Sequence, residues 1–194
     1  DRVDEVVDVC AEAFAGYPVM RYTVGDAGDV AARERRLVRL FVTRRVARGG
    51  PMYGVLSAGA RCSVLGAVLL TTPDEPAPPP EVAEISAAAW RELGEDARLR
   101  YDEYAAASNF FAAYPPHLHL NMIGVRRDQK GSGLGRVLLG AVRDLAEADP
   151  SYGGVSLTTE NPRNVDLYRH FGYEVAGHGT FGPHETWGMY LRVR

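Results

Sequence analysis

The sequence contains little cysteine, no long apolar run and no excess of positive charge. Cys10 and Cys62 are the only two cysteines among 194 residues, so a disulfide scaffold is excluded and both are interpreted as buried or idle thiols. The five histidines show no paired Cys/His or HExxH spacing, and we expect no bound metal. No run of about 18 apolar residues indicates a membrane span. The formal net charge of −3 provides no overall basic surface for nucleic acid.

The composition that is present is typical of a folded globular domain. Hydrophobic residues make up 46% and charged residues 24% of the chain, close to the usual values. A chain of this length buries roughly two-thirds of the surface that its unfolded form exposes. Disorder, collagen-like repeats and a coiled coil are therefore excluded. No basic leader with an apolar core opens the chain, so we expect a cytoplasmic protein.

Hydrophobic periodicity predicts helices that alternate with strands, which indicates one layered α/β or α+β domain. Helices are predicted over residues 3–14, 30–47, most of 86–113, 133–148 and 162–171. Strands are predicted over residues 52–57, 62–72, 117–125, 155–159, 173–177 and 186–193, with a turn at 58–60. Gly16-Tyr17-Pro18 is expected to end the first helix.

Three of these segments carry more specific predictions about their faces. Helix 30–47 is expected to turn Leu37, Leu40, Phe41 and Val46 inward. Its many arginines are interpreted as a solvated face, with an anionic-ligand patch as the alternative. Helix 133–148 is expected to bury Leu134, Val137, Leu138, Ala141, Val142 and Leu145. The aromatic side chains of 86–113 are expected in a helix core, with a substrate pocket as the alternative.

A glycine-rich turn joins the strand at 117–125 to the helix at 133–148. Gly131, Gly133 and Gly135 alternate there, so no side chain shields the amides, and the positive end of the helix dipole adds to an anion site. The basic residues around the turn are Arg126, Arg127, Lys130 and Arg136. The P-loop spacing is absent, and Arg136 replaces the third glycine of the dinucleotide fingerprint. A different phosphate ligand, or a tight turn that binds nothing, remains open.

A second group of polar residues follows the next strand. Asn161, Asn164 and Tyr168 lie on or beside a short predicted helix that ends at Gly172. Taken alone, Tyr168 is equally typical of a core aromatic on an amphipathic helix.

Together, the turn and this helix resemble the GNAT superfamily of acyl-CoA-dependent N-acetyltransferases. The turn matches from Val125 to Gly135, with Lys130 at the family's Gln/Arg position and Arg127 in place of its usual Pro. The second motif is matched by Asn161, Asn164, Tyr168, Gly172 and Tyr173. The puromycin N-acetyltransferase-like branch is resembled by His117 and Leu120 and by the closing Gly182, Pro183, Thr186, Trp187 and Met189. The match is good over residues 117–191 and weaker before them.

The resemblance implies a single GNAT domain over residues 1–194. Its α/β fold would be a mixed, mostly antiparallel central sheet flanked by helices, with splayed strands 4 and 5 in the family's order and a first strand expected before residue 1. The pantetheine arm of acetyl-CoA would lie in that splay. The residues implied to bind the cofactor are Met122, Ile123, Val125, Lys130, Gly131, Ser132, Gly133, Leu134, Gly135, Arg136, Asn161, Asn164 and Tyr168.

The implied reaction transfers the acetyl group of acetyl-CoA to the primary amine of a small molecule. Tyr168 is the predicted general acid, because a tyrosine of pKa about 10 is protonated at neutral pH. The amide of Ile123 is expected to stabilise the oxyanion. The base is open among Glu160, His117 and His119. Strand alternation would place His117, His119, Asn121 and Ile123 on one face, so the pattern does not separate the two histidines.

Two other functions remain open at this stage. One is a non-catalytic module that binds or senses acyl-CoA, and the other is a protein or peptide N-acetyltransferase. A peptide acceptor predicts a shallow groove, whereas the aromatic segment 90–114 favours a closed pocket. The identity of the amine, a role in antibiotic modification and a homodimer are left undecided by the sequence.

Overall fold

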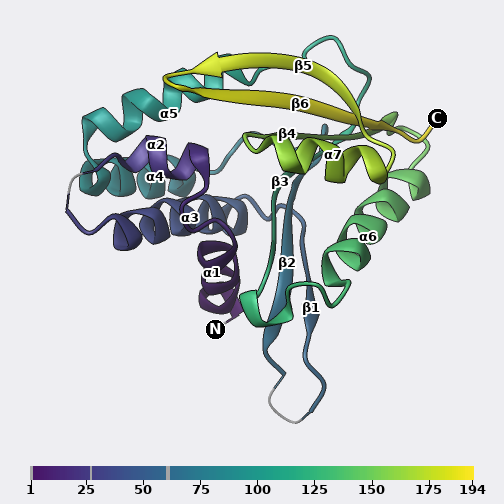
Figure 1. Ribbon diagram of the computed structural model, residues 1–194, viewed down its shortest axis with the longest axis horizontal. Helices are drawn as coiled ribbons and strands as arrows, with labels where there is room; N and C mark the ends of the chain where they lie inside the picture. Colours follow the sequence, from purple (N-terminus) through teal and green to yellow (C-terminus); the bar gives the residue numbers. More distant parts are fainter. Residues whose placement is uncertain (1, 27, 60–61) are drawn as a thin grey trace.

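The computed structural model describes residues 2–26, 28–59 and 62–194, and it is built around a six-stranded sheet (Figure 1). The strand order is β1-β2-β3-β4-β6-β5. The strands are β1 Met52–Leu56, β2 Val64–Thr71, β3 Leu118–Val125, β4 Gly154–Thr159, β5 Glu174–Phe181 and β6 His184–Arg192. Only the β3–β4 pair is parallel among the pairings of these strands. The predicted mixed, mostly antiparallel sheet flanked by helices is confirmed.

The helices cover both faces of the sheet. They are α1 Arg2–Ala13, α2 Pro18–Val24, α3 Val30–Ala47, α4 Pro80–Leu93, α5 Glu95–Ala107, α6 Leu134–Ala148 and α7 Pro162–His170, with a 3₁₀ turn η1 at Arg127–Gln129. Helix α1 packs on β2 and β3 and supports α3, whereas α6 packs on β1 to β4 from the other side (Figure 1). Helix α7 contacts β4, β5 and β6. Within the described ranges, no helix combines the length and apolar character that a membrane crossing needs.

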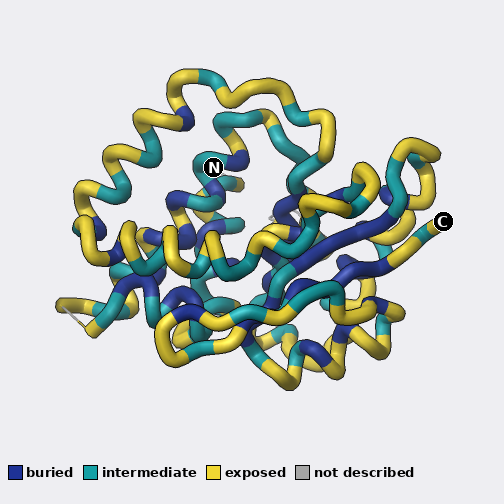
Figure 2. Tube along the Cα trace, turned by 90° about the horizontal axis from the view of Figure 1, so that it is seen from above, coloured by how far each residue is buried: buried dark blue, intermediate teal, exposed yellow. Residues whose placement is uncertain are grey.

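Two hydrophobic clusters fill the spaces between the sheet and its helices. One lies on the α6 and α7 side and includes Leu70, Leu120 and Leu138. The other lies on the α1 to α5 side and includes Leu37, Leu69 and Met122. Figure 2 shows the burial along the chain trace: buried stretches of extended chain run between coiled segments on which buried and exposed residues alternate. The core therefore has two halves, separated by the sheet.

A β-bulge in β3 reverses the strand's alternation. Leu69 pairs with Met122 and Leu70 with Leu120, so Asn121 is the extra residue. One inserted residue exchanges the faces of everything that follows it. Ile123 consequently packs against the same cluster as Leu120, while Met122 belongs to the opposite cluster. The prediction that Ile123 shares a face with the histidines of this strand is wrong for this reason.

Several predicted elements also differ from the structure. Residues 18–24 form α2, with Pro18 in its first turn, where a break alone was predicted. Segment 86–113 is two helices, α4 and α5, which separate at Gly94 with φ of +93° and end at Ala107. Strand β2 begins at Val64 rather than at residue 62. The predicted turn at 58–60 extends to Ala60, which lies outside the described residues.

Two helix faces are rotated from their predicted positions. In α3, Val46 is 41% exposed while Arg45 is buried, because Arg45 has polar partners inside the protein. In α6, Val137 is 58% exposed and Leu139 is buried. The buried side chains of α6 are Leu138 and Val142, as predicted, together with Leu139 and Ala146. Hydrophobic periodicity predicted that these helices exist, but it did not predict which face each helix turns toward its neighbours.

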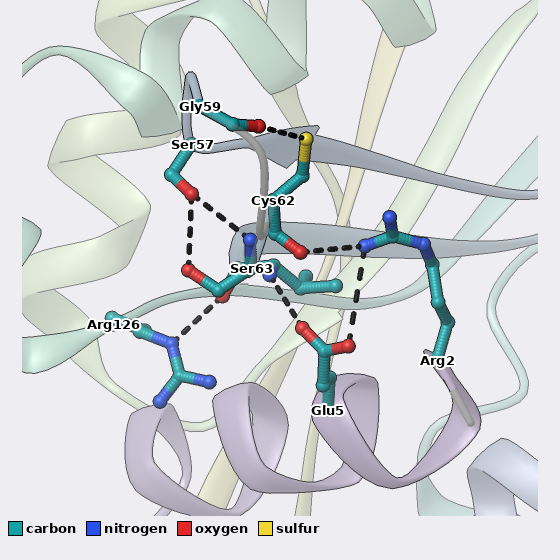
Figure 3. Close-up of polar contacts among 8 residues, drawn as sticks. Arg2, Glu5, Ser57, Gly59, Cys62, Ser63 and Arg126 are labelled. Carbon is teal, nitrogen blue, oxygen red and sulfur yellow. Dashed lines mark hydrogen bonds and ion pairs between the residues drawn. The ribbon is translucent and has the colours of Figure 1, made fainter.

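Polar contacts fasten α1 and the start of the glycine turn to the β1–β2 hairpin (Figure 3). The Glu5 carboxylate accepts from the Val64 amide at 2.8 Å, and Arg2 donates to the Cys62 carbonyl at 3.3 Å. The Arg126 Nε donates to the Val64 carbonyl at 2.7 Å. Arg126 therefore anchors the turn to β2.

Candidate active site

The central cavity begins where β3 and β4 separate. These parallel strands pair only through Leu118 with Val155, His119 with Ser156, and Leu120 with Leu157. The bulge at Asn121 follows directly, and the two halves of the sheet then diverge (Figure 1). A cavity of about 620 Å³ lies at this divergence, lined by side chains of α1, α3, α5, β3, β4 and α7 among others. The backbone of β3 beyond Asn121 thus has an edge without a protein partner strand.

The structure brings some of the predicted site residues together in this cavity and leaves others outside. The predicted residues that line it are His119, Met122, Ile123, Glu160, Asn164 and Tyr168. His117 is not among the lining residues. Its Nδ1 lies 2.7 Å from the Pro115 carbonyl oxygen, and its ring contacts those of Tyr114 and Tyr190. Tertiary structure therefore separates the two histidines that the strand pattern could not.

Glu160 follows the end of β4 and is the one carboxylate among the described residues that line the cavity. It is only 6% exposed, and the Thr186 hydroxyl donates to its Oε1 at 3.0 Å. Burial raises the pKa of this carboxyl to about 7, although hydrogen bonds from Thr186, Tyr104 and Tyr17 act in the opposite direction. A carboxylate with this pKa is suited to accept a proton near neutral pH.

His119 has different properties despite lining the same cavity. Its Nδ1 lies 2.8 Å from the hydroxyl of Ser156, which is fully buried. Burial, together with the nearby charges of His117 and Arg45, lowers the pKa of the imidazole to about 4. His119 is therefore neutral at pH 7 and a weaker base than Glu160.

Tyr168 on α7 provides a phenol at the cavity wall. The side chain is 8% exposed, and its hydroxyl forms no hydrogen bond with any part of the chain that the structure describes. Burial raises its pKa well above the ordinary value of 10. The phenol therefore stays protonated across the neutral range and has a free proton to donate.

Tyr17 lies between the first helices and this site, and sequence reasoning missed it. Its hydroxyl lies 2.7 Å from the Thr159 Oγ1 and accepts from the Glu160 amide at 3.1 Å. The Asn164 Nδ2 donates to the Thr159 Oγ1 at 3.3 Å. No sequence signal distinguishes Tyr17, because it lies in a Gly-Tyr-Pro segment typical of any helix end. Its position shows that the first helices help to hold β4 and α7 in place.

The glycine turn supplies the predicted unshielded amides. Gly131 and Gly133 have φ of +85° and +86°, a conformation that favours glycine, and open space surrounds the position of a Cβ at both. Two of the seven predicted amides are used within the turn: Lys130 N donates to the Arg127 carbonyl and Ser132 N to that of Gln129, each at 3.2 Å. The amides of Gly131, Gly133, Leu134, Gly135 and Arg136 donate to no acceptor in the described parts of the chain.

The arginines of α3 are not a uniform solvated face. Arg44, Arg45 and Arg48 line the cavity. Arg45 is 9% exposed, donates to the Thr71 Oγ1 at 2.7 Å and pairs with Glu75, while Arg48 lies 3.5 Å from the same carboxylate. The prediction of a solvated arginine face is wrong at these positions, because Glu75, from the loop after β2, compensates arginine charge inside the protein.

Replacing Glu75 with glutamine is expected to lower the free energy of unfolding by about 2 kcal/mol. Loss of one partner leaves a buried guanidinium uncompensated, and the hydrogen bond of Arg45 to Thr71 limits the loss. Glu92→Gln, which removes an exposed pair with Arg36, is the matched control and should cost less than about 1 kcal/mol. Urea unfolding measures both, and equal effects would contradict a buried role for Glu75.

The fold and cavity define a class of protein. They combine a parallel strand pair that splays at a bulge, an amide-rich turn before a helix, and a carboxyl and a phenol that line the cavity. The chain belongs to the acetyltransferase (GNAT) family, whose sequence model matches residues 70–173, more than half of the chain. Among curated proteins, none matches it.

Solved structures show the same fold at low sequence identity. A Corynebacterium glutamicum protein described as histone acetyltransferase HPA2 and related acetyltransferase is 20% identical, with a TM-score of 0.66 over 99% of this chain and 92% of that one. The C-terminal condensation domain of Ebony, in complex with beta-alanyl-dopamine, is 14% identical, with a TM-score of 0.65 over 99% and 94%. The NatC complex bound to Gag peptide and CoA includes a chain that is 10% identical, with a TM-score of 0.53 over 100% and 91%.

Proposed function

We propose that this protein is an N-acetyltransferase that moves the acetyl group of acetyl-CoA to the primary amine of a small molecule. The observation that carries the proposal is that Glu160 and Tyr168 line the same cavity at the strand divergence. One is a buried carboxyl with a pKa of about 7, and the other is a phenol that stays protonated. Amine acetylation is accelerated by one group of each kind, a base for the amine and an acid for the leaving thiolate.

The residues present fit acetyl-CoA, which would supply the acetyl thioester when bound. Met122, Ile123 and Val125 lie on the part of β3 that has no pairing with β4, where an extended arm can add to the sheet edge. The five free amides of the turn and the N-terminus of α6 suit a pyrophosphate. Asn161 caps α7 by accepting from the Arg163 amide, and the Asn164 Nδ2 is held by Thr159. Of the two, Asn164 is the one that lines the cavity and is proposed to contact the arm.

Each catalytic side chain has a defined task in this proposal. Glu160 accepts the proton that the attacking amine loses as its bond to the acetyl carbon forms. Tyr168 donates a proton to the sulfur as the carbon–sulfur bond breaks, and the Ile123 amide stabilises the oxyanion. Within the family, the closing sequence that includes Thr186 is the basis for proposing the puromycin N-acetyltransferase-like branch. The Thr186 hydroxyl donates to Glu160 and would hold its carboxylate in place.

A small-molecule acceptor is favoured over a peptide. The cavity volume of about 620 Å³ is within the usual range for small ligands, and aromatic side chains of α5 form one wall. The NatC structure contains a peptide, so a peptide acceptor is the second candidate. The reaction is proposed for a single domain in the cytoplasm, as the sequence predicts.

The direct test is release of free CoA thiol from acetyl-CoA in the presence of a panel of primary amines and short peptides. Turnover with amines but not peptides supports the proposal. Turnover with peptides alone would favour the second candidate. Calorimetric binding of acetyl-CoA, without release of CoA thiol in the presence of any acceptor, would make the protein a binding module.

Gly133→Ala is expected to weaken CoA binding about tenfold. A side chain at φ of +86° strains the turn by roughly 1–2 kcal/mol, and relief of that strain moves the free amides. Gly140→Ala is the matched control, because it lies within α6, has open space around it and has no positive φ. The control should bind CoA normally. Calorimetry measures both, and unchanged binding in Gly133→Ala would remove the turn from the cofactor site.

A further inference from the structure

The charges around the cavity are unevenly matched. The described lining residues include the guanidinium groups of Arg44, Arg45 and Arg48 but only one carboxylate, Glu160. Glu75 pairs with both Arg45 and Arg48 and so compensates one of their two charges. Arg44 is half-buried and has no ion pair or hydrogen bond from its side chain to any residue in the described ranges. The cavity therefore has an excess of positive charge on the side formed by α3.

An aromatic wall connects this positive side to the proposed base. The rings of Phe41 and Tyr101 lie 5.4 Å apart and those of Tyr101 and Tyr104 lie 6.0 Å apart. Tyr104 Oη lies 3.0 Å from the Thr158 Oγ1, two residues before Glu160. Arg44 and Glu160 act on the Tyr101 pKa in opposite directions, Arg44 lowering it and Glu160 raising it. Both charged groups therefore lie near enough to Tyr101 to act on its hydroxyl.

We propose that the acceptor amine carries a carboxylate at the end remote from its nitrogen, joined by an aromatic or apolar body. Arg44 binds the carboxylate, the Phe41–Tyr101–Tyr104 wall packs against the body, and the amine reaches Glu160. This assignment rests on the proposed function. A half-buried guanidinium without a partner attracts an anion strongly, and its planar donors match a carboxylate.

The phosphates of CoA are a less suitable partner for Arg44. The free amides of the glycine turn lie at the start of α6, and none of the residues of that turn is among those that line the cavity beside Arg44. The two anion sites therefore belong to different ligands. If Arg44 instead bound CoA, its removal would weaken CoA binding, and this is a separate measurement.

The test compares phenethylamine bearing a para-carboxylate with its para-carboxamide, which has nearly the same shape without the charge. The native protein should use the acid with a kcat/KM about 10-fold or more above that of the amide, because hydrogen bonds to a charged group are the stronger kind. Arg44→Gln should reduce this ratio to about 1 through KM, with CoA binding unchanged. Arg36→Gln, on the same helix but paired with Glu92 outside the cavity, should keep the native ratio.

Either of two kcat/KM ratios would overturn the assignment: a native ratio near 1, or a ratio that survives Arg44→Gln. Weaker CoA binding in Arg44→Gln would also overturn it. Calorimetric binding of both compounds to the CoA-saturated protein applies the same criteria without turnover. If no amine in any panel releases thiol, the proposed function fails, while a binding preference for the acid that disappears in Arg44→Gln still supports the anion site. Arg44→Glu should reverse the preference toward a para-aminomethyl analogue, and an unchanged preference would count against it.

Discussion

Tyr168→Phe is expected to lower kcat roughly 10²- to 10³-fold while leaving acetyl-CoA binding unchanged. The substitution removes only the hydroxyl, which lines the cavity and makes no hydrogen bond with the described chain, so the packing of α7 is retained. The loss corresponds to the usual contribution of a positioned general acid. Thiol release measures kcat, and calorimetry measures binding.

The matched control for this prediction is Tyr173→Phe. The two rings lie 5.6 Å apart, and the Tyr173 hydroxyl is buried without a hydrogen-bond partner in the described structure. Tyr173 is not among the residues that line the cavity, so the control should retain native kcat and stability close to that of the parent. Full activity of Tyr168→Phe would remove Tyr168 from the role of acid.

Glu160→Gln is expected to reduce kcat/KM roughly 10²- to 10³-fold at pH 8. It should also abolish the rise of kcat/KM through pH about 7 that the native protein shows as this carboxyl ionises, since its pKa is about 7. Glu185→Gln is the control, because Glu185 is exposed on β6 and pairs with His178. A native profile that rises near pH 4 instead, with Glu160→Gln active, would favour His119 as the base.

The same variant has a separate effect on stability. The pKa of Glu160 is raised from 4.5 to about 7 in the folded protein, so the folded state binds this proton more tightly than the unfolded state. Its stabilising effect is complete below pH 4.5 and is lost as the pH rises through about 7. Relative to the native protein, Glu160→Gln should therefore gain on the order of 3 kcal/mol in free energy of unfolding between pH 4.5 and 8. Urea unfolding at several pH values measures the difference in free energy of unfolding between the variant and the native protein. A difference that does not change with pH would show that folding does not raise the pKa of Glu160.

The local motifs of the second half were predictable because they depend on neighbouring residues. The glycines of the turn, the capping Asn161 and the amphipathic pattern of α6 all act within a few positions of themselves. The positions of most strands were predictable for the same reason. Helix α2 was missed because Pro18 is typical both of a helix break and of a first helical turn. The bulge at Asn121 was missed because the alternation of hydrophobic residues continues through it.

The sequence by itself determined the layered α/β class and the family resemblance, because both depend on short spacings of glycine, asparagine, tyrosine and apolar residues. The mixed sheet and the candidate phenol followed from that resemblance. Only the tertiary structure gave the Glu160 carboxyl and the His119 imidazole opposite pKa shifts and separated Arg44 from its neighbouring arginines. Those properties depend on desolvation and on charged partners that come from distant segments: Tyr17, Tyr104 and Thr186 around Glu160, and Glu75 beside Arg45. The pKa of a buried group and the compensation of a charge are set by what surrounds them in space, so no local pattern could specify them.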